Sequence, residues 1–124
     1  MQQIIIGIDV SQNGLDVAYW DEFAPQFLGT FANRTEGLDQ LSCAIESLPV
    51  FHPGQQVLIV IEPTGGYEQL LARFAIERQW KVALPNPKQL RDWAKGIGTR
   101  AKTDKQDALI LARYGASVEP PTWN

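Results

Sequence analysis

"QVLIVIEP", residues 56–63, is the stretch that decides the fold. It is an unbroken apolar run of strand length, which is typical of a parallel strand covered by helices on both faces. Such a strand belongs in the middle of a sheet. The sequence therefore predicts an α/β domain built around this strand, which ends in an acidic residue, Glu62.

Three further strands are predicted before it, the first from a short β-branched run and the other two from alternating apolar and polar residues. They are "QIIIGID" (3–9), "LDVAYW" (15–20) and "PQFLGTFAN" (25–33). The first two are separated by "SQNG" (11–14), whose Asn-Gly pair suits a tight hairpin turn. We expect an antiparallel trio.

Helical spacing of apolar residues begins at Thr35 and ends at Pro49, with Asn33 or Thr35 as the candidate N-cap. A second helical stripe follows the "TGG" turn and includes Tyr67, which we expect in the core. The remaining predicted elements are a short strand at 81–87, a helix at 88–95 and a helix from Thr103 to Tyr114, stopped by Gly115.

This order, β-β-β-α-β-α-β-α-α, matches the ribonuclease H-like fold. The connections between its parallel strands must be right-handed crossovers. We expect a five-stranded mixed sheet in the order 3-2-1-4-5, flanked by helices. Residues 1–116 form the predicted domain, and residues 117–124 are expected to be a linker or a truncated tail.

Composition restricts the class of protein. The 124 residues suffice for one domain, and no apolar run is long enough to span a bilayer. The N-terminus lacks the features of a signal peptide, so a cytoplasmic protein without membrane contact is expected. Cys43 is the only cysteine and lies on an apolar helical stripe, which favours a buried residue without chemistry.

Charge is unevenly distributed along the chain. Residues 1–80 hold three basic and ten acidic side chains, whereas residues 81–124 hold eight basic and four acidic ones. Basic residues concentrated in this way are typical of a nucleic-acid-binding surface or of a solvated helix face, and charge alone does not decide between the two. The candidate residues are Lys88, Arg91, Lys95, Arg100, Lys102 and Lys105.

Two carboxylates end neighbouring strands of the predicted sheet. Asp9 ends the first strand, and Glu62 ends the parallel strand beside it. Because adjacent strands lie about 4.8 Å apart, side chains at their ends can share one divalent cation. The alternative is that each is a solvated strand end or caps the following turn.

Two more carboxylates open the last helix, in "AKTDKQDALILARYG" (101–115). Asp104 is explained by the helix dipole and by the capping pattern of Thr103 and Gln106, but Asp107 is not. Asp107 is instead expected to face the protein and to need a partner. Four carboxylates form a site of hard oxygen ligands, which predicts Mg²⁺ or Mn²⁺ bound by Asp9, Glu62, Asp104 and Asp107 for phosphodiester chemistry.

Three motifs in this order, "GIDVSQNGLDVA", "EPTGGYE" and "NPKQLRDWAKGIGTRAKTDKQDA", resemble the N-terminal domain of the DEDD insertion-sequence transposases related to Piv-type DNA invertases. The resemblance covers nearly the whole chain. It implies a domain like that of the RuvC Holliday-junction resolvase, with the acidic tetrad at the same four positions. The family commonly has Lys where this chain has Gln12.

The resemblance also implies a bacterial or archaeal site-specific recombinase that acts on DNA. It implies a homo-oligomer, in many members a structured guide RNA, and a second, C-terminal domain with a serine nucleophile, which we expect to be absent from these 124 residues. Two alternatives stay open. One is a non-catalytic nucleic-acid-binding or assembly module, and the other is an ATPase lobe like those of actin and the sugar kinases.

Overall fold

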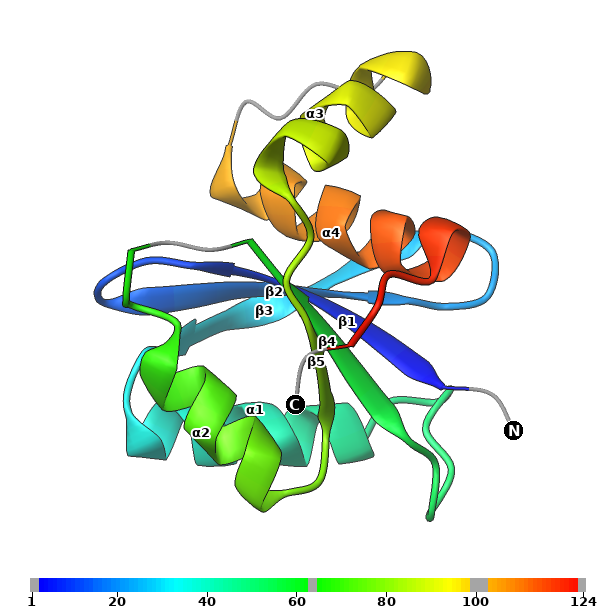
Figure 1. The fold of residues 1–124 in the computed structure, drawn as a ribbon. Helices are drawn as coiled ribbons and strands as arrows, with labels where there is room; N and C mark the ends of the chain where they lie inside the picture. Colours follow the sequence, from blue (N-terminus) through cyan, green and yellow to red (C-terminus); the bar gives the residue numbers. More distant parts are fainter. Residues whose placement is uncertain (1–2, 63–64, 99–102, 123–124) are drawn as a thin grey trace.

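The computed structural model describes residues 3–62, 65–98 and 103–122. It contains one five-stranded sheet in the order β3-β2-β1-β4-β5, with helices on both faces (Figure 1). The predicted order of elements and of strands is therefore confirmed. The strands are β1 (Ile4–Val10), β2 (Gly14–Trp20), β3 (Pro25–Ala32), β4 (Val57–Ile61) and β5 (Lys81–Ala83), and the helices are α1 (Thr35–Glu46), α2 (Gln69–Glu77), α3 (Pro87–Gly96) and α4 (Asp104–Val118).

The turn between β1 and β2 is closed by hydrogen bonds between a serine and a glycine. The Ser11 N–H donates to the Gly14 carbonyl oxygen at 2.9 Å, and the Gly14 N–H donates to Ser11 Oγ at 3.3 Å. This turn fixes the antiparallel register in which Val10 pairs with Leu15. On its other side β1 pairs in parallel with β4, as the apolar run predicted.

Alternate residues of β1 face different helices. Ile4, Ile6 and Ile8 belong to the core that the sheet shares with α1 and α2, whereas Ile5 belongs to the core shared with α3 and α4. Figure 1 shows α1 and α2 below the sheet, α4 above it, and α3 stacked on the outer side of α4. One face of the sheet is therefore covered by α1 and α2 and the other by α4, with α3 stacked on α4.

α4 lies unusually close to the sheet because two glycines leave room for it. A Cβ on Gly7 would collide with the backbone of α4 at Ala108 and Ala112, and a Cβ on Gly115 would lie 2.7 Å from Val60 Cγ2. Gly115 was predicted to stop the helix, and this was wrong. The helix continues to Val118 and ends where Glu119 adopts a left-handed φ of 52°, so Gly115 serves packing instead.

Three smaller expectations were also wrong. The N-cap of α1 is Arg34, which makes no side-chain capping bond. Tyr67 is 49% exposed rather than in the core, and Cys43 is exposed because it lies outside the buried stripe of α1. None of the helices in the described ranges combines the length and the hydrophobicity needed to cross a membrane.

Candidate functional site

The ends of β1 and β4 bring two predicted site residues to the same edge of the sheet. The parallel register pairs Gly7 with Val60 and Ile8 with Ile61, so the next residue of each strand would be Asp9 and Glu62. Val60 faces α4, and the alternation of side chains along the strand places Glu62 on that same face. Both carboxylates are partly buried.

α4 approaches this edge with its N-terminal turn. Along β1, Ile5 lies against Gly115, and Gly7 lies against Ala108 and Ala112. Each step of two residues along β1 moves about one turn back along α4, so one more step from Gly7 would bring Asp9 level with the first turn. This turn holds Asp104 and Asp107, and Asp107 is partly buried.

The start of α4 is fixed by its cap. The Thr103 side chain accepts a hydrogen bond from the Gln106 N–H at 3.2 Å, as the T-x-x-Q pattern predicted. The first turn therefore begins where the sequence indicated. The side chain of Asp104 lies outside the described part of the structure.

The donor set at this edge suits a hard divalent cation, because it offers carboxylate oxygens and no sulfur or imidazole. Among the described residues, no three Asp, Glu, His or Cys side chains lie close enough together to hold a metal ion. Asp104, the fourth predicted ligand, is not among the side chains that this statement covers. Ion binding by Asp9, Glu62, Asp104 and Asp107 stays a prediction.

A further carboxylate that the sequence analysis did not single out lies beside Asp9. Asp16 of β2 is its direct partner in the β1–β2 register, and Thr30 of β3 is in turn the partner of Asp16. The Thr30 hydroxyl donates to Asp16 Oδ1 at 2.6 Å. The hairpin turn could have revealed this pair from the sequence. A register in which Val10 pairs with Leu15 also pairs Asp9 with Asp16.

Asn33 joins the two loops that follow the carboxylate-bearing strands. Its Nδ2 donates to the Ser11 carbonyl oxygen at 2.9 Å and to the Tyr67 carbonyl oxygen at 3.0 Å. These carbonyls lie in the turn after β1 and in the loop after β4. The residue was predicted as a helix cap, but it holds these loops together instead, a role that no local sequence pattern reveals.

The loop after β4 contains two glycines in left-handed conformations. Gly65 has φ 76° and Gly66 has φ 119°, and a Cβ on either would meet nothing within 4 Å. The Gly66 N–H donates to the Glu68 Oε1 atom at 3.1 Å. The loop is therefore bent sharply and leaves open space beside the end of β4.

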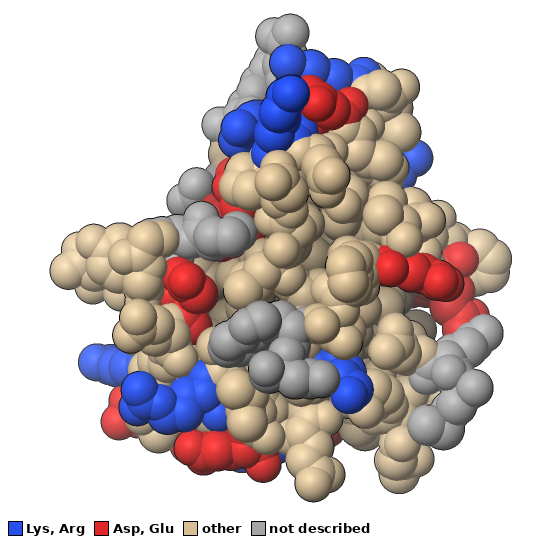
Figure 2. All heavy atoms as spheres, viewed as in Figure 1, with Lys and Arg blue, Asp and Glu red and all other residues tan. Residues whose placement is uncertain are grey.

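The basic residues gather over α3. Lys88, Arg91 and Lys95 are all exposed on this helix, which Asn86 caps by accepting from the N–H groups of residues 88 and 89. Figure 2 shows Lys and Arg side chains grouped on this protruding part of the molecule. Arg100 and Lys102 lie outside the described residues, so their contribution to this surface stays a prediction.

Lys105 lies on the first turn of α4, where its Nζ is 5.3 Å from the centre of the Phe27 ring. Phe27 is on β3, so this cation–π contact joins α4 to the edge strand on the same face as the carboxylates.

Trp93 of α3 packs edge-to-face on Tyr114 with ring centroids 5.2 Å apart. Trp93 thus attaches α3 to α4.

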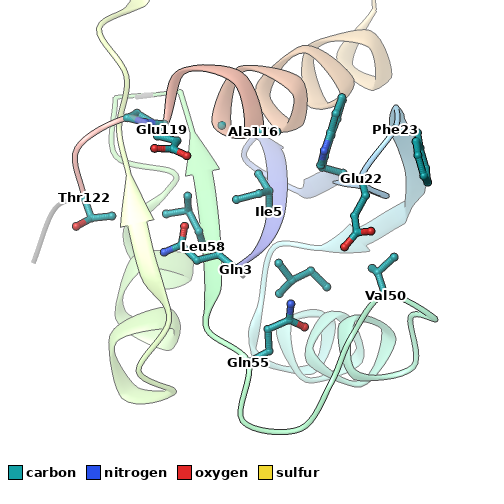
Figure 3. Close-up of a pocket in the computed structure, with 14 residues that line it drawn as sticks. Gln3, Ile5, Glu22, Phe23, Val50, Gln55, Leu58, Ala116, Glu119 and Thr122 are labelled. Atoms are coloured by element: carbon teal, nitrogen blue, oxygen red, sulfur yellow. The ribbon is translucent and has the colours of Figure 1, made fainter. Parts of the chain in front are cut away.

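A cavity of about 900 Å³ lies at the other end of β1 and β4 (Figure 3). Ile5 and Leu58 form its floor, while Glu22 and Glu119 lie at its sides. It contains none of the predicted site residues. The cavity and the carboxylate edge are therefore separate features.

Comparisons with known proteins agree on one family and one fold. A sequence model of the DEDD transposases, described as a transposase, matches residues 6–121. The pilin gene-inverting proteins of Moraxella lacunata and Moraxella bovis are each 40% identical to the chain over 124 residues. This alignment covers 99% of the chain but 37% of each relative, so the chain spans a little over a third of their length.

Among solved structures, Thermus thermophilus RuvC, determined in complex with a Holliday junction substrate, is similar to the chain with a TM-score of 0.59. The two share 16% sequence identity, and the match covers 98% of this chain and 100% of that one. At this identity the likeness shows the fold. The five-stranded mixed sheet is that of the ribonuclease H-like proteins, as the order of elements predicted.

Proposed function

Because this chain belongs to the DEDD transposase family, we propose that it is the metal-dependent catalytic domain of a site-specific DNA recombinase. It would cleave and rejoin phosphodiester bonds. One observation carries the proposal: the β1–β4 register brings the strand ends at Asp9 and Glu62 to the edge that the first turn of α4 approaches. In this proposal, chain segments separated by up to about a hundred residues supply acids to a single edge.

We assign metal binding to Asp9, Glu62, Asp104 and Asp107. A bound pair of Mg²⁺ or Mn²⁺ ions would supply activation of the attacking oxygen and stabilisation of the leaving oxygen. The protein's own contribution is positional. Ser11 and Tyr67 are joined through Asn33, which holds the loops behind Asp9 and Glu62 at a fixed separation.

DNA is the proposed partner, held through its phosphates by the basic surface of α3 and α4. Lys88, Arg91 and Lys95 are exposed, and Lys105 lies on the same helix turn as the acids. Arg100 and Lys102, which lie between these helices in the sequence and outside the described residues, are proposed to contact DNA as well. The homo-oligomer, the guide RNA and the cytoplasmic location stay predictions.

A second candidate function is a nucleic-acid-binding module without catalysis, which the exposed basic helix also supports. Membership of the transposase family decides against the ATPase lobe. The two remaining functions differ in what one carboxylate does. Asp107 should be essential for cleavage in the first and dispensable for binding in both.

The test compares the parent chain with Asp107→Asn in Mn²⁺-dependent nicking of branched and linear DNA. Asp39→Asn is the matched control, since Asp39 is an exposed acid on α1, which covers the opposite face of the sheet. We expect a loss of about 100-fold or more for Asp107→Asn and none for the control, because a direct ligand should matter at least as much as its supporting residues. Equal nicking by both variants would remove Asp107 from the mechanism, and binding without nicking by the parent would favour the module.

A further inference from the structure

Asp9 and Asp16 form a pair of like charges across two strands. They are direct partners in the antiparallel register of β1 and β2, and both are partly buried. The next pair on the same face of the sheet is Gly7 and Ala18, which face α4. Directly opposed side chains have Cβ atoms about 4.5 to 5.5 Å apart, a separation at which two carboxylates repel and destabilise the sheet.

Asp16 is held in place from the other side. The Thr30 hydroxyl on β3 donates to its Oδ1 at 2.6 Å, a short bond of the kind formed with a charged acceptor. Thr30 is also the direct partner of Asp16 in the β2–β3 register. This bond holds the Asp16 carboxylate in one orientation beside Asp9.

We propose that Asp16 is a positioning residue for the carboxylate edge, whose fixed negative charge strengthens divalent-cation binding at Asp9 without itself contacting the ion. This inference rests on the proposed function. A carboxylate within several ångströms of a divalent cation attracts it, and the attraction is strong where solvent is partly excluded.

A purely structural role is the competing explanation, in which the bond between Thr30 and Asp16 only joins β3 to β2. The two explanations predict different effects of Asp16→Asn on the metal-free melting temperature and on cation affinity. If Asp16 is structural, Asp16→Asn should lower the melting temperature without metal and leave cation affinity unchanged. If it is a positioning residue, the same change should weaken cation binding while the metal-free protein becomes no less stable.

The experiment measures the Kd for Mn²⁺ by electron paramagnetic resonance and the melting temperature in EDTA, on the 124-residue chain. For Asp16→Asn we expect Mn²⁺ affinity to fall about tenfold at low ionic strength, with the loss shrinking in high salt. The metal-free melting temperature should stay the same or rise by about 1 to 4 °C, because a like-charge pair is removed.

Three variants serve as comparisons. Glu46→Gln removes one negative charge from α1, below the sheet, and should leave the Kd unchanged. Thr30→Val removes the hydroxyl and should weaken Mn²⁺ binding about threefold, since Asp16 then loses its anchor. Thr30→Ser restores a hydroxyl and should restore the affinity.

An Asp16→Asn protein with the parent's Kd would overturn the inference, as would a lower affinity accompanied by a matching loss of metal-free stability. Failure of the proposed function would give a different result, in the Mn²⁺ affinity of Asp9→Asn. In that case Asp9→Asn would bind Mn²⁺ as tightly as the parent. If Asp9→Asn loses affinity and Asp16→Asn does not, the inference about Asp16 alone is wrong.

Discussion

Gly7 lies where β1 passes directly beneath α4. A Cβ at this position would collide with backbone atoms of Ala108 and Ala112, which cannot rotate away as a side chain can. We predict that Gly7→Ala lowers the free energy of unfolding by about 1 to 3 kcal/mol, the usual range for overpacking, as measured by urea denaturation. The carboxylate edge should loosen too, because α4 carries Asp104 and Asp107.

Gly96 provides the control for this substitution. It lies in α3, and a Cβ there would meet nothing within 4 Å. Gly96→Ala should therefore leave stability unchanged or raise it slightly, since alanine favours a helix. A Gly7→Ala protein as stable as Gly96→Ala would contradict the close packing of α4 on β1.

Asp21 gives the stability a specific dependence on pH. The N–H groups of Ala24 and Phe23 donate to its Oδ1, each at 2.8 Å, and hold the pKa of this carboxyl below its usual value of 3.8. A carboxyl whose pKa is lower in the folded state stabilises the protein above pH 3.8, and this contribution is lost as the pH falls through the folded pKa.

We therefore predict that Asp21→Asn lowers the melting temperature at pH 7 and that the difference from the parent narrows as the pH falls below 3.8. Melting curves between pH 7 and pH 2 measure this. The exposed Glu77, at the end of α2, is a suitable control as Glu77→Gln. A constant difference between parent and Asp21→Asn over that range would show that the carboxylate charge is not involved.

α3 is the element on which DNA binding depends most in this account. Replacing Lys88, Arg91 and Lys95 with Gln should weaken DNA binding at every sequence tested. It should also lower the slope of log affinity against log salt by about 2 to 3, because each phosphate contact contributes about 0.9. Fluorescence anisotropy at several salt concentrations measures both quantities.

The matched triple variant changes the same number of charges elsewhere, by replacing Arg34, Arg73 and Arg78 with Gln. Two of these lie in ion pairs with Glu36 and Asp39, on the side of the sheet covered by α1 and α2. This variant should leave the salt slope unchanged. Equal losses in both variants would mean that net charge, rather than α3, drives binding.

Individual elements show which local signals could be read from the sequence. The apolar run of β4 and the Asn-Gly turn after β1 determine the strand order, because each indicates a particular strand type or connection. The end of α4 was missed since Gly115 resembles a stop but is small because Val60 and Ile5 lie against it. Contacts between distant segments, such as that of Asn33, leave no local pattern.

The molecule as a whole brings charges of both signs to the side of the sheet that α4 covers. Acidic residues that end strands lie at one edge of the sheet, and the exposed basic residues of α3 lie beyond α4 on the same side. The predicted site could be placed at this edge from the strand order alone. Its side-chain geometry could not be, because it depends on how closely α4 approaches β1.

The position of Mn²⁺ in a crystal of the 124-residue chain tests the central claim most directly. Anomalous diffraction at the manganese edge would locate the ion independently of the protein atoms. The account predicts a peak at the edge formed by β1, β4 and the first turn of α4, with oxygens of Asp9, Glu62 and at least one of Asp104 and Asp107 as ligands. Manganese bound elsewhere, with these four carboxylates directed to different sides of the molecule, would contradict it.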